Sequence, residues 1–278
     1  MPDNKGKDID KAKKKAVDGL KSHIEGMGDV AYEIMLQQIE NTFDIKGGKI
    51  QPSKEFVKQL NKLTVEVLDL LQHEPKFNGP VSQFVKRMPN IENAIVDFQK
   101  EVNGIKVPDF AIAKKIATDE IIDQMLNNGL NQEFVVPLRD LVFENVSHGL
   151  SLKDARLKIK EFIKGGGDTT GKLSRYIEQT AEQAVTAYSG IIGNKLMDTF
   201  NYDGMLIVGS LIDNSSPQCR YCINELKGTI KRTDWPKVEK IAKENGLVKD
   251  TTFNDLPLNL LHWGCKHDFY PIILNKAS

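Results

Sequence analysis

The sequence predicts a mostly α protein with a small C-terminal α+β domain, in which short antiparallel strands surround a Cys/His zinc knot. Apolar residues recur at steps of three and four through the first 200 residues or so, which is the spacing of an amphipathic helix. Short apolar, β-branched runs typical of strands occur only after that point. The three cysteines, Cys219, Cys222 and Cys265, lie between these runs.

The composition is that of a globular protein without net charge. The 278 residues suffice for one large or two modest domains, and 40% hydrophobic with 27% charged residues can bury a core. Lys+Arg and Asp+Glu both number 38, which excludes the overall basic charge of a dedicated nucleic-acid coat. No apolar run suggests a membrane span or a secretory signal. We expect the product to stay where it is made or to leave by lysis.

Residues 1–105 are predicted to form a helical N-terminal region. A first apolar stripe runs from Ala16 to Met35, a second follows the candidate N-cap Ser53, and a third covers residues 81–102. Glycine and proline predict interruptions at residues 26–29, 47–48, 78–80 and 89. Such stripes are usually packing faces, so they predict helix–helix contacts and not an active site.

Residues 106–278 are predicted to form the second domain, after a boundary at residues 103–108. The expected helices cover residues 109–128, 131–147, 151–164, 169–200 and 234–245. The expected strands cover residues 205–212, 228–232 and 269–274. Ser151 opens one helix with a capping-box-like start, and Gly165-Gly166-Gly167 ends it.

The cysteine pattern predicts a metal site. Three cysteines argue against a disulfide framework and for a reducing compartment. Cys219 and Cys222 form a Cys-x2-Cys pair, and the segment from His262 to His267 brings Cys265 between two histidines. Two such pairs complete the tetrahedron that zinc prefers. We expect Cys219, Cys222 and Cys265 to bind zinc together with His262 or His267, which makes a closed, structural site.

Motifs for catalysis are missing from the sequence. The zinc deaminase pattern needs His-x-Glu shortly before Pro-Cys-x-x-Cys, whereas here Pro217-Gln218-Cys219 is out of register by one residue. No Gly-x-Ser-x-Gly, Walker-type loop or His-Glu-x-x-His occurs. None of these patterns therefore indicates a catalytic site.

The order of motifs after residue 106 resembles a known family. A long helix leads into a strand that ends at Asp213, and Cys219-x2-Cys222 follows with Leu226-Lys227-Gly228 shortly after. The segments Leu256-Pro257-Leu258 and His262 to His267 then precede a terminal strand. Over residues 106–275 this order resembles the minor head proteins of tailed bacteriophages, the phage Mu protein F-like head-morphogenesis family.

The motif departs from the family's pattern at three places, one of which is Trp263-Gly264, where members carry Pro-Asn after the His. Asn214, Ser215 and Ser216 stand where members usually carry an Arg between the Asp and the first Cys. His267 stands in place of the final Cys, a change that preserves a metal ligand and adds weight to His267.

The resemblance implies a structural virion protein that acts in head assembly near the portal, built in the host cytoplasm, without catalysis. Its implied partners are portal or other head proteins, and contact with packaged DNA stays open. Because the resembling domain lies at the other end of the chain, we expect residues 1–105 to supply docking or self-association surface. We also expect chelation to loosen the C-terminal domain and to leave the N-terminal helices intact.

Two alternatives come from other classes of protein. A zinc-containing nuclease of the HNH kind would use His262 or His267 with Asp268 in metal-assisted hydrolysis. A zinc adaptor would bind nucleic acid through the basic segment of residues 151–176. The cations of that segment are Lys153, Arg156, Lys158, Lys160, Lys164, Lys172 and Arg175.

Overall fold

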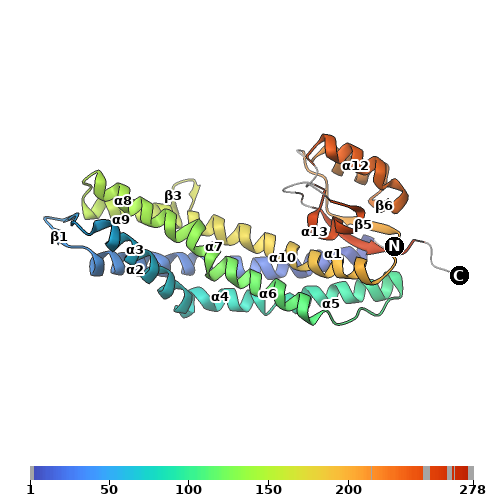
Figure 1. The fold of residues 1–278 in the computed structure, drawn as a ribbon, viewed down its shortest axis with the longest axis horizontal. Coiled ribbons are helices and arrows are strands. Elements are labelled where there is room, and N and C mark those ends of the chain that lie inside the picture. Colours follow the sequence, from blue (N-terminus) through green and yellow to red (C-terminus); the bar gives the residue numbers. More distant parts are fainter. Residues whose placement is uncertain (1–2, 214, 247–250, 262–264, 266, 275–278) are drawn as a thin grey trace. The chain divides into compact units, whose positions relative to one another are not determined.

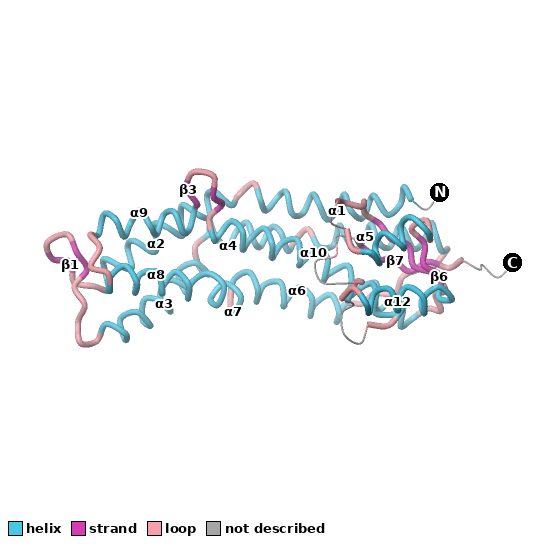
Figure 2. The backbone as a smooth tube through the Cα atoms, turned by 90° about the horizontal axis from the view of Figure 1, so that it is seen from above, coloured by secondary structure: helices cyan, strands magenta, loops and turns pink. Residues whose placement is uncertain are grey.

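The fold is mostly helical, with a few short antiparallel strands near the C-terminal end, as the sequence predicts (Figure 1). It is taken from a computed structural model that describes residues 3–213, 215–246, 251–261, 265 and 267–274. Helices make up most of the backbone, and strands are confined to short segments (Figure 2).

The chain forms two compact units, each discontinuous in sequence. One unit, here called the sheet unit, contains residues 1–15, 88–118 and 184–278; the other, the helical unit, contains residues 16–87 and 119–183. The predicted division at residue 105 does not separate them. The reason is helix length: α1 (Asp3–Lys21), α6 (Ala111–Leu126) and α10 (Lys172–Thr199) each have residues in both units.

The helical unit is built from amphipathic helices and two small hairpins. Its remaining helices are α2 (Ile24–Thr42), α3 (Phe56–His73), α4 (Pro75–Val85), α7 (Asn128–Leu130), η2 (Asn131–Val135), α8 (Val136–Ser147) and α9 (Leu152–Lys164). Its hairpins are β1–β2 (Ile45–Lys46, Lys49–Ile50) and β3–β4 (Gly165–Gly166, Thr169–Thr170). Ser151 caps α9 as predicted, since its hydroxyl accepts a hydrogen bond from the Asp154 N–H.

Three predicted interruptions differ in the structure. The first break lies at residues 22–23, not at 26–29. Gly47 and Gly48 form a hairpin turn instead of a simple helix stop, because φ values of 57° and 70° suit glycine. The interruption expected at Pro89 lies at residues 86–87, and Pro89 sits in the first turn of α5 (Met88–Phe98).

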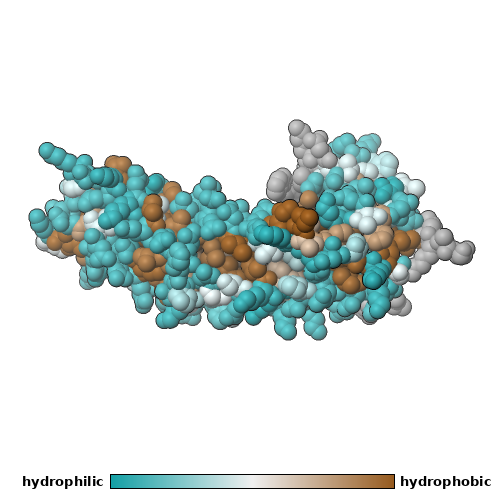
Figure 3. All heavy atoms as spheres, turned by 60° about the horizontal axis from the view of Figure 1, so that its bottom comes forward, coloured by the Kyte–Doolittle hydropathy of each residue, from teal (hydrophilic) through white to brown (hydrophobic). Residues whose placement is uncertain are grey.

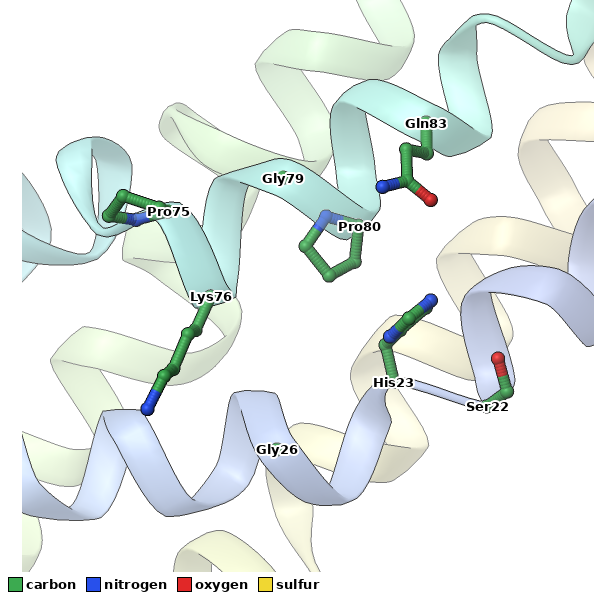
Figure 4. Close-up of a pocket in the computed structure, with 8 residues that line it drawn as sticks. All are labelled: Ser22, His23, Gly26, Pro75, Lys76, Gly79, Pro80 and Gln83. Atoms are coloured by element: carbon green, nitrogen blue, oxygen red, sulfur yellow. The ribbon is translucent and has the colours of Figure 1, made fainter.

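The turn predicted at residues 78–80 is wrong, because these residues lie inside α4. A proline inside a helix costs about 3 kcal/mol. However, Phe77, Val81 and Phe84 are fully buried on one face of α4, and each buried side chain contributes about 1.5–3 kcal/mol. Their sum exceeds the cost of Pro80. The proline ring lies beside a solvent-facing cavity of about 320 Å³ between α2 and α4 (Figure 4).

The sheet unit contains a three-stranded antiparallel sheet in the order β6-β5-β7. Its strands are β5 (Gly204–Val208), β6 (Thr229–Lys231) and β7 (Asp268–Ile272), shorter versions of those predicted. All five residues of β5 are buried, as a central strand requires. The other elements of this unit are α5, η1 (Gln99–Asn103), α11 (Pro217–Arg220), η3 (Tyr221–Glu225), η4 (Arg232–Asp234), α12 (Trp235–Glu244), η5 (Phe253–Asp255) and α13 (Leu256–Asn259).

Buried side-chain amides from η1 cover the outer edge of β7. The Gln99 and Asn103 amide nitrogens each donate to the Pro271 carbonyl at 3.1 Å, and the Ile273 N–H donates to Asn103 Oδ1 at 2.8 Å. The Tyr202 hydroxyl donates to Gln99 Oε1 at 2.8 Å. These bonds satisfy the backbone groups that an edge strand would otherwise leave unpaired.

Asn103→Ala is expected to lower the free energy of unfolding by about 1–2 kcal/mol, because it removes the acceptor of the part-buried Ile273 N–H and one of the two amides that donate to the buried Pro271 carbonyl. Urea denaturation measures this loss. Exposed Asn90→Ala, on α5 of the same unit, is the control and should change stability by less than about 0.5 kcal/mol. Equal effects at both positions would contradict the assigned role of Asn103.

Candidate metal centre

Cys219 and Cys222 lie in α11 and η3, directly after a turn from β5 that hydrogen bonds stabilise. Ser216 caps α11 by accepting the Cys219 N–H, and Pro217 fixes the first helical position. The Arg220 guanidinium donates to the backbone carbonyls of Ile212, Asp213 and Ser215 at 3.2, 2.5 and 3.0 Å. Cys219 therefore projects from a turn whose backbone is held at both ends.

The second half of the centre is positioned by close packing of α13 on α10. A Cβ atom at Gly190 would lie 2.5 Å from the Pro257 carbonyl oxygen, and one at Gly193 would lie 2.7 Å from the Pro257 Cβ. Only glycine allows this approach. Cys265 and His267 follow along the chain, immediately before β7.

Three predicted ligands meet in one cluster: the ligand atoms of Cys219, Cys265 and His267 all lie within 4.8 Å of one another. The two sulfurs are 3.7 Å apart, and Cys265 Sγ lies 3.6 Å from His267 Nδ1. In a tetrahedral zinc site with Zn–S of about 2.3 Å and Zn–N of about 2.0–2.1 Å, two sulfur ligands lie about 3.8 Å apart, and a sulfur and a nitrogen ligand lie about 3.6 Å apart. A disulfide, in contrast, needs sulfurs about 2.05 Å apart. The cluster can therefore hold a metal ion.

The centre is buried, and its surroundings raise the pKa of the Cys265 thiol and of the neighbouring Cys222 thiol. Cys219, Cys265 and His267 are 2%, 8% and 4% exposed. The hydrogen bond with Cys219, together with burial, raises the pKa of Cys265 well above its usual range. Burial raises the pKa of Cys222 to about 12. His267 Nε2 is buried and has no hydrogen-bond partner among the described residues. A metal cation would favour the thiolates and release their protons.

The five predicted ligands have different outcomes. Cys219, Cys265 and His267 are brought together, which places His267 in the centre. Cys222 is fully buried nearby but is not part of this group. His262 lies outside the described residues. Cys222 and His262 stay predictions for the fourth ligand.

A charged cluster beside the centre is not among the features that the sequence predicts. Lys13 of α1 is buried, and its Nζ lies 2.6 Å from Asp268, the residue after His267. Asp10, one turn earlier on α1, faces the same group. The helical spacing of the sequence could have indicated a buried lysine here, because Lys13 interrupts the buried apolar face formed by Ile9, Ala16 and Leu20.

Asp10→Asn is expected to stabilise the protein at neutral pH. Burial, followed by the nearby charge of Asp268, raises the pKa of Asp10 from 3.8 to about 6. The folded state thus favours the protonated carboxyl, and this contribution is lost as the pH rises through about 6. Because Asp10 is partly exposed, we expect a gain of only about 1 kcal/mol at pH 7. Thermal unfolding at pH 4 and 7 measures it; an equal effect at both pH values would contradict the assignment.

The basic segment of residues 151–176 is partly neutralised within the helical unit. Arg156 pairs with Glu40 and Lys164 with Asp29, both on α2. Lys172 lies 3.9 Å from Glu133 of η2. These ion pairs reduce the positive surface that the nucleic-acid alternative requires.

No protein-family model, curated protein or solved structure matches the chain. Over the part of the chain that the structure describes, no helix is long and apolar enough to cross a bilayer.

Proposed function

We propose that this chain is a structural virion protein, a minor head protein of a tailed phage, whose C-terminal fold is held by a structural zinc ion. The observation that carries the proposal is the meeting of Cys219, Cys265 and His267 at tetrahedral distances. These residues occupy the metal-motif positions of the family that the sequence resembles.

Zinc is the metal that this donor set favours. Two thiolates and an imidazole suit a tetrahedral Zn²⁺ ion, whereas magnesium and calcium prefer oxygen ligands. Each of the three ligands is more than nine-tenths buried, which would keep a substrate away from the ion. A fourth protein ligand, Cys222 or His262, would close the site, so the proposal assigns a structural and not a catalytic role.

The proposed partners are portal or other head proteins, or further copies of this chain. Hydrophobic side chains group in patches among hydrophilic ones on the face in Figure 3. Among the described residues before position 105, the exposed large hydrophobic residues lie on α3: Val57, Val65 and Leu70. Ile112 and Ile116, one turn apart on α6, are also exposed. Contiguous exposed apolar residues mark docking surfaces, so we propose Ile112 and Ile116 of the sheet unit as docking residues in addition to those on α3 of the helical unit.

The test is the location of the protein in assembled particles. Purified virions from the phage or prophage that encodes the chain are analysed by mass spectrometry, and the protein is pulled down from infected cells. We expect the protein in virions and in a complex with portal protein. A chain that is absent from virions, stays monomeric and nicks plasmid DNA with magnesium would favour the nuclease instead.

A further inference from the structure

Strand β7 links the proposed metal centre to the beginning of the chain. His267 is a member of the metal cluster, and the next residue, Asp268, begins β7. The Asp268 carboxylate lies 2.6 Å from Lys13 Nζ, and the two side chains are only 18% and 7% exposed. The backbone of Asp268 pairs with Val208 of β5. The residue beside the ligand is therefore fixed by β5 through its backbone and by α1 through its side chain.

The ammonium group of Lys13 balances the negative charge of the carboxyl groups around the start of β7. Two carboxyl groups, Asp10 and Asp268, face its ammonium group. The Lys13 Nζ also lies 5.7 Å from the centre of the Tyr270 ring, which packs on Phe98 of α5 with ring centres 5.7 Å apart. A buried charge is retained at such a position only when it is paired, because unpaired burial is costly.

We infer that Lys13 is a positioning residue of the metal centre, which holds Asp268 and thereby fixes the backbone that presents His267. The inference rests on the proposed metal site. Groups that orient a metal ligand without touching the ion typically change affinity 10–100-fold when they are mutated. Without Lys13, the neighbouring carboxyl groups of Asp10 and Asp268 would lose the cation that balances their charge, and the start of β7 would lose its ion pair with α1.

If the ion pair between Lys13 and Asp268 strengthens metal binding, metal binding must strengthen that ion pair by the same free energy. A bound metal that orders His267 and Asp268 also stabilises the docking of Lys13. We therefore expect metal to protect residues 3–15, which lie more than 200 positions before the ligands Cys219, Cys265 and His267. This differs from the sequence-based expectation that chelation leaves the N-terminal helices intact.

The first experiment measures the zinc affinity of the full-length protein by competition with a chromophoric chelator. Lys13→Met is expected to bind zinc 10–100-fold more weakly than the unmodified chain. Lys14→Met, an exposed lysine on the same helix, is the matched control and should bind normally. If Lys13→Met fails to fold, the double variant with Asp10→Asn removes one of the two opposed carboxylates and is measured instead. Unchanged affinity in a folded variant would overturn the inference.

The second experiment follows hydrogen exchange of the full-length protein with and without chelator. Amides of residues 3–15 should lose protection on zinc removal, whereas residues 24–42 of α2 should not. Wild-type protein that binds zinc but shows no change in residues 3–15 overturns this inference alone. Wild-type protein that binds no zinc overturns the metal proposal as well, so the two failures are distinguishable.

Discussion

Cys219→Ser is expected to abolish zinc binding and to lower the free energy of unfolding of the sheet unit by more than about 4 kcal/mol. Structural zinc contributes on the order of 10 kcal/mol to small sites, and this unit has a core of its own that limits the loss. Serine keeps the size of the side chain but is a poor zinc ligand. Thermal unfolding of the purified variant measures the effect.

Chelation supplies the control for Cys219→Ser. The wild-type protein should lose stability when zinc is removed, while the variant should not respond, because both changes remove the same interaction. Residues 16–87 and 119–183 form the other unit and should keep their helical structure. A variant as stable as the wild type, or one that still responds to chelator, would contradict a structural role for the metal.

Gly190→Leu is expected to destabilise the sheet unit by about 3 kcal/mol, because a side chain at this position meets the backbone of α13. The Pro257 carbonyl oxygen would lie 2.5 Å from the new Cβ atom, and backbone cannot move aside as a flexible side chain can. Displacement of α13 should also shift the segment that leads to Cys265. We therefore expect weaker zinc binding together with the loss of stability.

Gly26→Leu is the matched control for Gly190→Leu. Gly26 also lies inside a helix, α2, but a Cβ atom at this position would meet no atom within 4 Å, and the residue borders the cavity in Figure 4. Leucine is a better helix former than glycine by close to 1 kcal/mol, so this variant should be slightly more stable. Equal destabilisation by both substitutions would show that helix glycines matter generally and that close packing on α13 is not the cause.

Local patterns predict the parts of this fold that local forces determine. The helical stripes, the Ser151 cap and the strands after residue 200 are confirmed, because spacing and capping act over a few residues. The Cys/His motif predicted the three side chains, Cys219, Cys265 and His267, that the structure brings close enough together to hold a metal ion. His267 could be favoured over His262 only through the family resemblance, since either spacing allows a ligand.

Other features depend on contacts between distant segments and could not be read from spacing. Asn78-Gly79-Pro80 has the residues of a turn, but burial of Phe77 and Phe84 keeps it helical. The two units combine segments far apart in sequence, which no local pattern encodes. The ion pair of Lys13 with Asp268 also joins segments far apart in sequence, so spacing does not predict it. The position of Lys13 on an apolar helix face indicates only that the lysine is buried.

X-ray absorption at the zinc edge of the purified full-length protein tests whether Cys219, Cys265 and His267 hold one zinc ion, as we propose. We expect one zinc per chain in a four-coordinate shell with at least two sulfurs at about 2.3 Å and at least one nitrogen at about 2.0–2.1 Å. A third sulfur would identify Cys222 as the fourth ligand, and a second nitrogen would identify His262. Protein without zinc, or zinc bound only by oxygen and nitrogen, would contradict the claim.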